Sequence, residues 1–236
     1  VMSYKILLLA ILSVAFVYSC KTNKYNGLTL KYDKVLLSPE NWSVEVEDPD
    51  KSRITFSENR MEIDVSRGAT IWFRKKMEGD IIIEYDATVV SDKGKNDRVS
   101  DLNCFWMFSD PGVKDGSLNF DKNNRKGRFS NYHSLQGYYV GFGGHNNTKT
   151  RFRRYNGTIN RPLLPEHDLS DPEFLIVANK KQHIKLVVMG NRIQYFSNEK
   201  PVFDWMDENV LKSGWFAFRT VSNHMVIENF KVYGKW

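Results

Sequence analysis

The sequence predicts an all-β domain in which antiparallel strands form a sandwich or a barrel. Short segments of alternating apolar and polar residues recur along the chain, for example Met61, Ile63 and Val65. This period of two residues is typical of a half-buried strand. Polar turns follow at short spacing, and Gly190-Asn191 has the form of a two-residue hairpin. No segment shows a sustained helical period.

The first expected strands lie at residues 53–56, 61–65, 70–73 and 81–90, with Glu78-Gly79-Asp80 as the turn before the fourth. Three strands dense in aromatic residues follow at 102–108, 137–143 and 150–155. The hairpin then joins strands at 183–189 and 192–196, and Ser213-Gly214 precedes a strand at 215–220. Along that strand Trp215, Ala217 and Arg219 share one face, and Phe216 and Phe218 share the other, which we expect to face the core. A turn at SNHM sets His224 near the start of the last strand, 225–233.

Three long connections flank the aromatic strands, at residues 91–100, 109–134 and 156–181. Connections of this length in a compact β domain usually carry function or cap a site. A chain of 236 residues with 41% hydrophobic and 14% aromatic content can bury a sizeable core. We expect one domain, over residues 28–236.

The first twenty residues have the layout of an export signal. Lys5 precedes an apolar run from Ile6 to Val17, which is short for a membrane span, and Cys20 follows in a context that resembles a bacterial lipobox. We expect a signal peptide over residues 1–19, a lipidated Cys20 and a tether to residue 27. Plain secretion and an uncleaved anchor are the alternatives, because Tyr18 is bulky for this pattern. The expected location is the bacterial cell envelope, on the periplasmic side, with the cell surface as the alternative.

Metal and cysteine chemistry are not indicated. With Cys20 lipidated, Cys104 is the remaining cysteine, and its apolar surroundings predict a small buried side chain. The five histidines are too scattered for a zinc motif. We expect no cofactor, with a structural calcium at Asp110, Asp115 and Asp121 as the alternative.

The formal net charge of +6 indicates an anionic partner. Nucleic acid is disfavoured by the expected compartment and by the absence of a Lys/Arg block. Membrane contact is expected through the lipid anchor alone. An acidic polysaccharide or oligosaccharide fits best, and the sequence carries no signal for oligomeric state.

Alternation over residues 150–155 places Arg151, Arg153 and Tyr155 on one face of a strand. Two guanidinium groups there need anionic partners, supplied either by Asp or Glu of this chain or by a uronate carboxylate. On the preceding strand Tyr139, Gly141 and Gly143 share a face. The glycines either clear space for a ligand or mark bulges.

These residue types suit β-elimination on a uronate. That reaction needs donors to neutralise the carboxylate, a base for the C5 proton and an acid for the leaving oxygen. The candidate catalytic residues are His133, Tyr139, His145, Arg151 and Arg153. The candidate substrate-binding residues are Asn103, Asn147, Tyr155, Trp215, Arg219 and His224.

Two other functions are open. One is a non-catalytic glycan-binding lipoprotein. The other is a glycoside hydrolase with a carboxylate pair drawn from Asp86, Asp101, Glu166 and Asp168.

Four segments carry a likeness to known domains: DLNCFWMFSDP, YYVGFGGHNNTKTRFRRYNG, RPLLPEHDLSDP and SGWFAFRTVSNHMVIENFKVY. The chain resembles concanavalin A-like jelly-roll domains of lipoproteins and secreted enzymes from bacterial polysaccharide-utilisation loci, and looks most like an uncharacterised family among them. It is more distantly similar to jelly-roll polysaccharide lyases and keto-disaccharide hydrolase domains. The resemblance implies an all-β, two-sheet antiparallel jelly-roll β-sandwich of the lectin/glucanase type, with a role in polysaccharide degradation.

Overall fold

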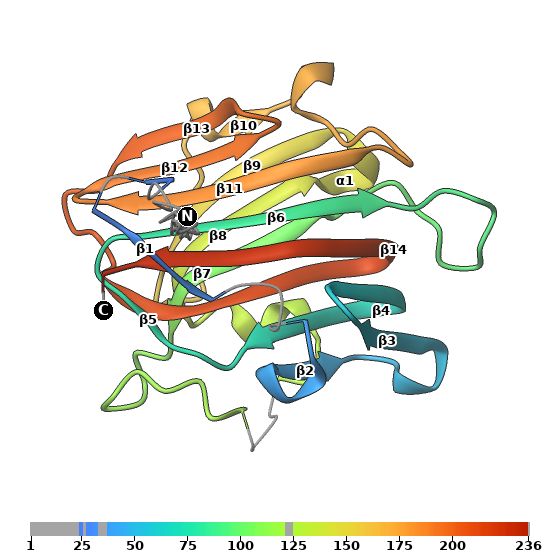
Figure 1. Ribbon diagram of the computed structural model, residues 1–236, viewed down its shortest axis with the longest axis horizontal. Coiled ribbons are helices and arrows are strands. Elements are labelled where there is room, and N and C mark those ends of the chain that lie inside the picture. The colour runs from blue at the N-terminus through green and yellow to red at the C-terminus, as the bar shows by residue number, and fades with distance from the viewer. Residues whose placement is uncertain (1–23, 26, 33–36, 121–124, 236) are drawn as a thin grey trace, which may run out of the picture.

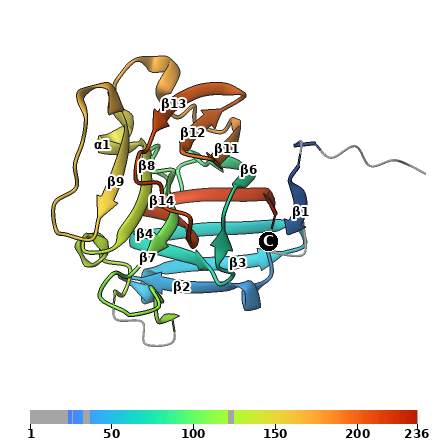
Figure 2. The same cartoon turned by 90° about the vertical axis from the view of Figure 1, so that its left-hand side faces the viewer.

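The computed structural model describes residues 24–25, 27–32, 37–120 and 125–235. The expected signal peptide and Cys20 lie outside these residues. The described chain forms a two-layered antiparallel β-sandwich (Figure 1), so the predicted jelly-roll fold is confirmed. Figure 2 shows β8 and β9 in one layer and β6 and β11 in the other. No helix within the described ranges is long and apolar enough to cross a bilayer.

Two long strands run through both layers, β4 (Arg60–Phe73) and β14 (Ser213–Gly234). Each was predicted as two separate strands. The turn expected before His224 is instead a bulge, because the pairing register shifts between Val221 and Asn223 and Ser222 has a φ of 45°. The two layers are therefore hydrogen-bonded into one curled sheet.

The front sheet contains the later half of β4, the early half of β14 and five further strands. These are β2 (Trp42–Val46), β7 (Asn103–Ser109), β8 (Gln136–Gly143), β9 (Lys149–Asn156) and β10 (Asp168–Leu169). The back sheet contains the other halves of β4 and β14. Its further strands are β3 (Ser52–Ser57), β6 (Ile81–Val89), β11 (Lys181–Met189), β12 (Arg192–Ser197) and β13 (Lys200–Met206).

Short elements complete the fold. β1 (Thr29–Tyr32) and β5 (Met77–Glu78) pair with the two ends of β14, and α1 (Gly144–Asn147) joins β8 to β9. Short 3₁₀ turns cover Pro39–Asn41, Pro49–Lys51, Phe129–Tyr132, Pro165–His167 and Pro172–Phe174. The sequence prediction missed β1, β5, β10 and β13, which are short or mostly exposed, and β2, which alternates over only five residues.

Alternation decides which side chains enter the core between the sheets. Phe216 and Phe218 point into it, as predicted, while Trp215 and Ala217 face outward from the front sheet. Cys104 is buried in the core, and burial raises the pKa of its thiol to about 12. The prediction of a small buried side chain at this position is confirmed.

A second apolar cluster covers part of the outer face of the front sheet. The segment Arg125–Leu135, called the arm below, packs Tyr132 against Trp72 and Phe105. The arm backbone touches the sheet directly, since a Cβ on Gly127 would lie 2.5 Å from the carbonyl oxygen of Gly68. One half of this outer face is therefore sealed, and the other half is open.

Candidate functional site

An open pocket of about 480 Å³ occupies the uncovered half of the outer face, beside α1 and the ends of β8 and β9. Its lining carries far more positive than negative charge. Asp101 is its one carboxylate within the described chain, against five cationic side chains: Arg98, Lys149, Arg151, Arg153 and Arg161.

Strand pairing places two of these arginines as the sequence predicted. Arg151 lies opposite Gly141 and Arg153 opposite Tyr139 in the β8–β9 ladder. Phe152 between them points into the core. The predicted shared face of Arg151 and Arg153 is confirmed, and it forms the floor of the pocket.

The glycines of β8 make room mainly for side chains of this chain. A Cβ on Gly141 would lie 2.7 Å from Oη of Tyr139, and one on Gly137 would lie 1.9 Å from the ring of Phe108. Only part of the space expected above this strand is therefore open to a ligand.

Arg151 is already paired. Its Nε and Nη2 donate to the two carboxylate oxygens of Asp168, at 2.9 and 3.1 Å. This hydrogen bond from the Arg151 guanidinium holds the pKa of Asp168 below its usual range. Of the two anionic partners considered for Arg151, the structure shows a carboxylate of this chain, that of Asp168.

Arg153 has different surroundings. Its Nη1 donates to the backbone carbonyl of Arg161, and no carboxylate of the described chain pairs with either guanidinium. The Arg161 guanidinium lies over the ring of Phe129, 5.3 Å from its centroid. Burial, followed by the nearby charge of Arg161, lowers the pKa of Arg153. A cation in this position gains from an anionic ligand.

The rim of the pocket is rigid. His145, Asn146 and Asn147 all have left-handed backbone angles, with φ of 54°, 57° and 60°. Such angles persist where surrounding contacts enforce them. Asn147 supplies two of these contacts. Its Nδ2 donates to the backbone oxygen of Ile176 at 2.9 Å, and its Oδ1 accepts from the backbone nitrogen of Ile176 at 2.8 Å. A third comes from Arg98, which donates to Asn146 at 2.7 Å.

The structure brings together four of the five candidate catalytic residues: Tyr139, His145, Arg151 and Arg153 line the pocket. The fifth, His133, belongs to the arm and packs against Phe129, with 5.2 Å between the ring centroids. It does not line the pocket.

The candidate substrate-binding residues lie outside the pocket lining. Asn147 holds the rim. Asn103 is buried, and its amide nitrogen donates to Oδ1 of Asp101 at 3.2 Å. Tyr155 is buried in the second apolar cluster, and Trp215 lies at the edge of that cluster beside Phe120.

Arg219 and His224 hold structural positions. Arg219 is 1% exposed, donates from Nη1 to Thr70 at 3.1 Å and to the carbonyl of Gly127, and therefore fastens the arm. His224 lies between Glu62 and Asp97, 2.9 Å from each. Sequence alternation gave the correct face for Arg219 but could not reveal that the arm covers it.

The sequence analysis missed Lys149, at the start of β9, and three loop residues of the site, Arg98, Phe129 and Arg161. All three belong to the long connections that were expected to carry function. The length of these connections was the signal in the sequence that they carry function. Chain position alone does not show which of their residues contact the sheet.

Protonation in the pocket is constrained. Because an Arg can only donate, Nε2 of His145 accepts from Nη1 of Arg151 at 2.6 Å, and the proton of the neutral ring lies on Nδ1. Burial, then the neighbouring Tyr155 and Asp101, raises the pKa of Tyr139 well above its ordinary value. Burial and three arginines lower the pKa of His133. Tyr139 is therefore a poor base, and His145 presents a donor.

The four carboxylates named for hydrolysis have different surroundings, and Glu166 is exposed in the turn Pro165–His167. Asp101 lines the pocket, Asp168 is engaged by Arg151, and Asp86 lies on the back sheet, 2.7 Å from His183. Among the described residues no three His, Cys, Asp or Glu side chains are placed to hold a metal. Asp110 caps a local turn, Asp115 does the same, and Asp121 lies outside the described residues.

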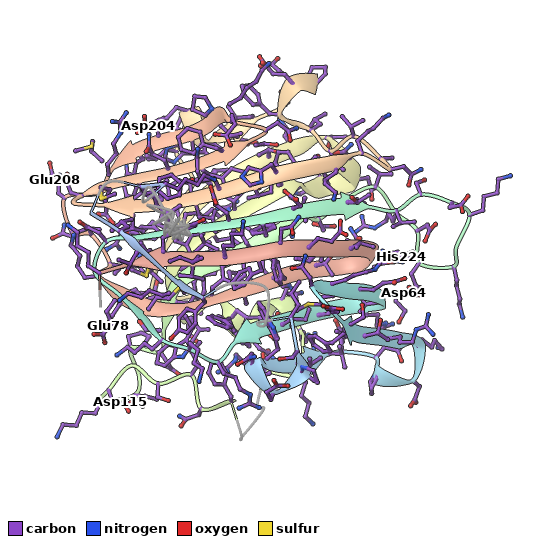
Figure 3. The ribbon with its side chains drawn as sticks, viewed as in Figure 1. Asp64, Glu78, Asp115, Asp204, Glu208 and His224 are labelled. Atoms are coloured by element: carbon purple, nitrogen blue, oxygen red, sulfur yellow. The ribbon has the colours of Figure 1, made fainter. Side chains whose placement is uncertain are left out.

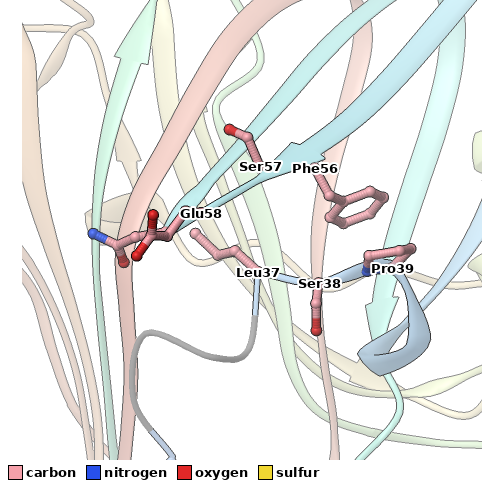
Figure 4. Close-up of a pocket in the computed structure, with 7 residues that line it drawn as sticks. Leu37, Ser38, Pro39, Phe56, Ser57 and Glu58 are labelled. Carbon is pink, nitrogen blue, oxygen red and sulfur yellow. The ribbon is translucent and has the colours of Figure 1, made fainter.

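A larger pocket, of about 670 Å³, lies between Leu37–Pro39 and the turn from β3 to β4 (Figure 4). Glu58 is the one ionisable residue among its described lining. The chain passes directly from this wall into residues 33–36, outside the described ranges, so we assign it no ligand.

Comparison with known proteins supplies a family and a fold. Residues 63–230 match the model of a family described as Domain of unknown function (DUF6250). No curated protein matches the chain.

Three solved structures are similar. A Bacillus subtilis protein of unknown function with a galectin-like fold has 18% identity and a TM-score of 0.64, over 87% of this chain and 96% of its own. The carbohydrate-binding module CBM66 from Bacillus subtilis has 15% identity and a TM-score of 0.53, over 82% and 96%. An endo-β-1,3-glucanase from Pyrococcus furiosus has 10% identity and a TM-score of 0.53, over 88% and 94%. At these identities the likeness establishes the fold alone.

Proposed function

We propose that the chain, which belongs to the DUF6250 family, binds an acidic saccharide in the cationic pocket of its front sheet. The observation that carries the proposal is the imbalance of charge: five cationic side chains of the described lining face two carboxylates, Asp101 in the lining and Asp168 beside it. Cations grouped in a concave site favour an anionic ligand. The fold is shared with a carbohydrate-binding module and a glucanase, which supports a saccharide as its class.

The pocket also has polar groups that suit a hydroxylated ring. Nδ1–H of His145 and the amide of Asn146 lie at its rim, while Phe129 and Tyr139 supply aromatic surface. The enforced left-handed backbone holds the rim in one conformation. Such preorganisation reduces the ordering cost of binding.

Binding without turnover is the function that the geometry supports best. β-Elimination is the second candidate. It is favoured by His145, which lies at the pocket rim beside cations that would neutralise a uronate carboxylate. β-Elimination requires the hydrogen bond between His145 and Arg151 to break, since Nε2 of His145 must be free to take the C5 proton.

The proposal includes presentation on the exported, lipid-anchored protein expected from the sequence. Lys24, the first described residue, pairs with Glu84 of β6 at 2.6 Å. Glu84 alternates with the core residues Ile83 and Tyr85 and so faces out from the back sheet. A tether leaving from this side would turn the pocket away from the anchor.

Calorimetric titration of the purified domain with acidic and neutral polysaccharides tests the proposal. We expect heat of binding from uronate-containing glycans, and a flat ultraviolet trace during prolonged incubation. A rise in the absorbance of unsaturated uronate would establish β-elimination instead. New reducing ends without that absorbance would establish hydrolysis, and the absence of binding to every acidic glycan would refute the proposal.

A further inference from the structure

The cations of the pocket divide into two groups. Arg151 is held by both oxygens of Asp168, and Arg98 donates to the carboxylate of Asp101. Lys149 lies 3.9 Å from Asp168. On this side of the pocket each positive charge has a carboxylate of the chain close by, so an incoming anion would have to compete with it.

The second group is Arg153 and Arg161. Neither forms an ion pair with a carboxylate in the described part of the chain, and their charges repel each other. A third guanidinium, that of Arg219, lies 5.0 Å from the centroid of Phe129, the ring that also carries Arg161. Positive charge is therefore concentrated at the arm end of the pocket, where Asp101 is a neighbouring charge of Arg219 but Arg153 and Arg161 form no ion pair with a carboxylate of the described chain.

Phe129 supports the Arg161 guanidinium, whose central carbon lies 5.3 Å from the ring centroid. A guanidinium that lies over an aromatic ring keeps its donors at the edge of its plane, where they match the two oxygens of a carboxylate. Phe129 is itself fixed, since Arg219 donates to the carbonyl of Gly127 two residues earlier and His133 packs edge-on against the ring. The arm thus presents Arg161 to the ligand.

We infer that Arg153 and Arg161 form the subsite for the carboxylate of a uronic acid residue, with Phe129 as the platform that orients Arg161. This inference rests on the proposed saccharide binding and specifies where its anionic group lies. The sugar ring then extends towards Tyr139 and the rim at His145, which line the same pocket. Arg151, which the sequence analysis placed in this role, is a structural partner of Asp168.

Sodium glucuronate and glucose, titrated separately by nuclear magnetic resonance, test the assignment. Arg153→Gln and Arg161→Gln should each weaken glucuronate binding about 10- to 100-fold, as expected for the loss of a charge-assisted, bidentate contact. The matched control is the double variant Arg192→Gln/Asp204→Asn on the back sheet, which removes an exposed ion pair at constant net charge. It should change the affinity less than about threefold.

Arg161→Lys keeps the positive charge but loses the planar guanidinium, so we expect an intermediate loss of glucuronate affinity. This variant replaces Arg161→Gln in the test if Arg161→Gln does not fold. Unchanged affinity in the Arg153 and Arg161 variants, or an equal loss in the double variant, would overturn the subsite while leaving saccharide binding intact. Inorganic sulfate competing more strongly than glucuronate would overturn the assignment to a carboxylate. Wild-type protein that binds glucuronate no better than glucose would refute the proposed function itself.

Discussion

The two halves of the front sheet's outer face use arginine in opposite ways. In the sealed half, Arg125 pairs with buried Glu45 at 3.0 Å, and Glu45 also accepts from Trp72 and Tyr132. In the open half, Arg153 and Arg161 pair with no carboxylate of the described chain. A buried charge is tolerated when it is paired and hydrogen-bonded. Two arginines without this compensation, Arg153 and Arg161, line the pocket in the half that faces solvent, as expected of a site completed by a ligand.

The largest effect is expected in the sealed half. Glu45→Gln leaves Arg125 buried without its counter-charge, which should lower the free energy of unfolding by about 3–5 kcal/mol. Urea denaturation measures this loss in the free energy of unfolding. Glu47→Gln is the control, because Glu47 is paired with Arg67 on the surface at 3.7 Å and its loss should be small. Equal effects of the two variants would remove the distinction between the halves.

Gly127→Ala should sharpen the comparison, because it loosens the arm that divides the halves. Gly127 has a φ of 71°, and an added Cβ would lie 2.5 Å from Gly68 O and 2.7 Å from Glu47 N. We expect a loss of about 1–3 kcal/mol in the free energy of unfolding. Binding of glucuronate should also weaken, since Phe129 moves with the arm. Full affinity in a folded Gly127→Ala protein would mean that the arm does not shape the pocket.

A smaller, pH-dependent effect is expected at His224, which lies opposite Asp64 in the ladder between β4 and β14 (Figure 3). Burial opposes the charged ring, but hydrogen bonds to Glu62 and Asp97, and the nearby Asp64, outweigh it and raise the pKa above 6.5. The stabilisation from this charge is therefore complete below about pH 6.5 and is lost as the pH rises through the higher folded-state pKa.

His224→Gln should accordingly destabilise the protein most in mild acid, and its difference from wild type should shrink as the pH rises. Urea denaturation at a series of pH values measures this. A difference that stays constant with pH would contradict a charged His224. His183, whose pKa is also raised, is common to both proteins and cancels in the comparison.

The smallest effect is expected on the back sheet. Arg192 pairs with Asp204 of β13 on the exposed surface, at 2.8 Å from Nε to Oδ1 (Figure 3 labels Asp204). Arg192→Gln should leave both unfolding and glucuronate binding unchanged within error. A loss of affinity comparable to that of Arg161→Gln would indicate that net charge, and not the pocket, attracts the ligand.

Much of the fold was readable from the sequence because it depends on local alternation. The period of two placed Arg151 and Arg153 on one face and Phe216 and Phe218 in the core, and both placements are confirmed. The continuity of β4 and β14 was not readable. Gly68 and the SNHM segment look like breaks in a local pattern, yet pairing between these two strands continues past both.

The site was only half readable, because its charge balance depends on contacts between distant segments. Asp168 neutralises Arg151 across 17 residues, and Arg161 returns beside Arg153 from a long connection. Nothing in the sequence spacing distinguishes Arg151, which Asp168 neutralises, from Arg153. Only the tertiary structure shows which of the two has no carboxylate partner in the described chain.

The central claim is that the open half binds a saccharide through its carboxylate. The most direct measurement is calorimetric titration of the wild-type protein with a uronate oligosaccharide and with the same oligosaccharide after reduction of its carboxyl groups. We predict that the acidic form binds at least about tenfold more tightly, with a difference that narrows as salt is added. Equal affinities for the two forms would contradict the account.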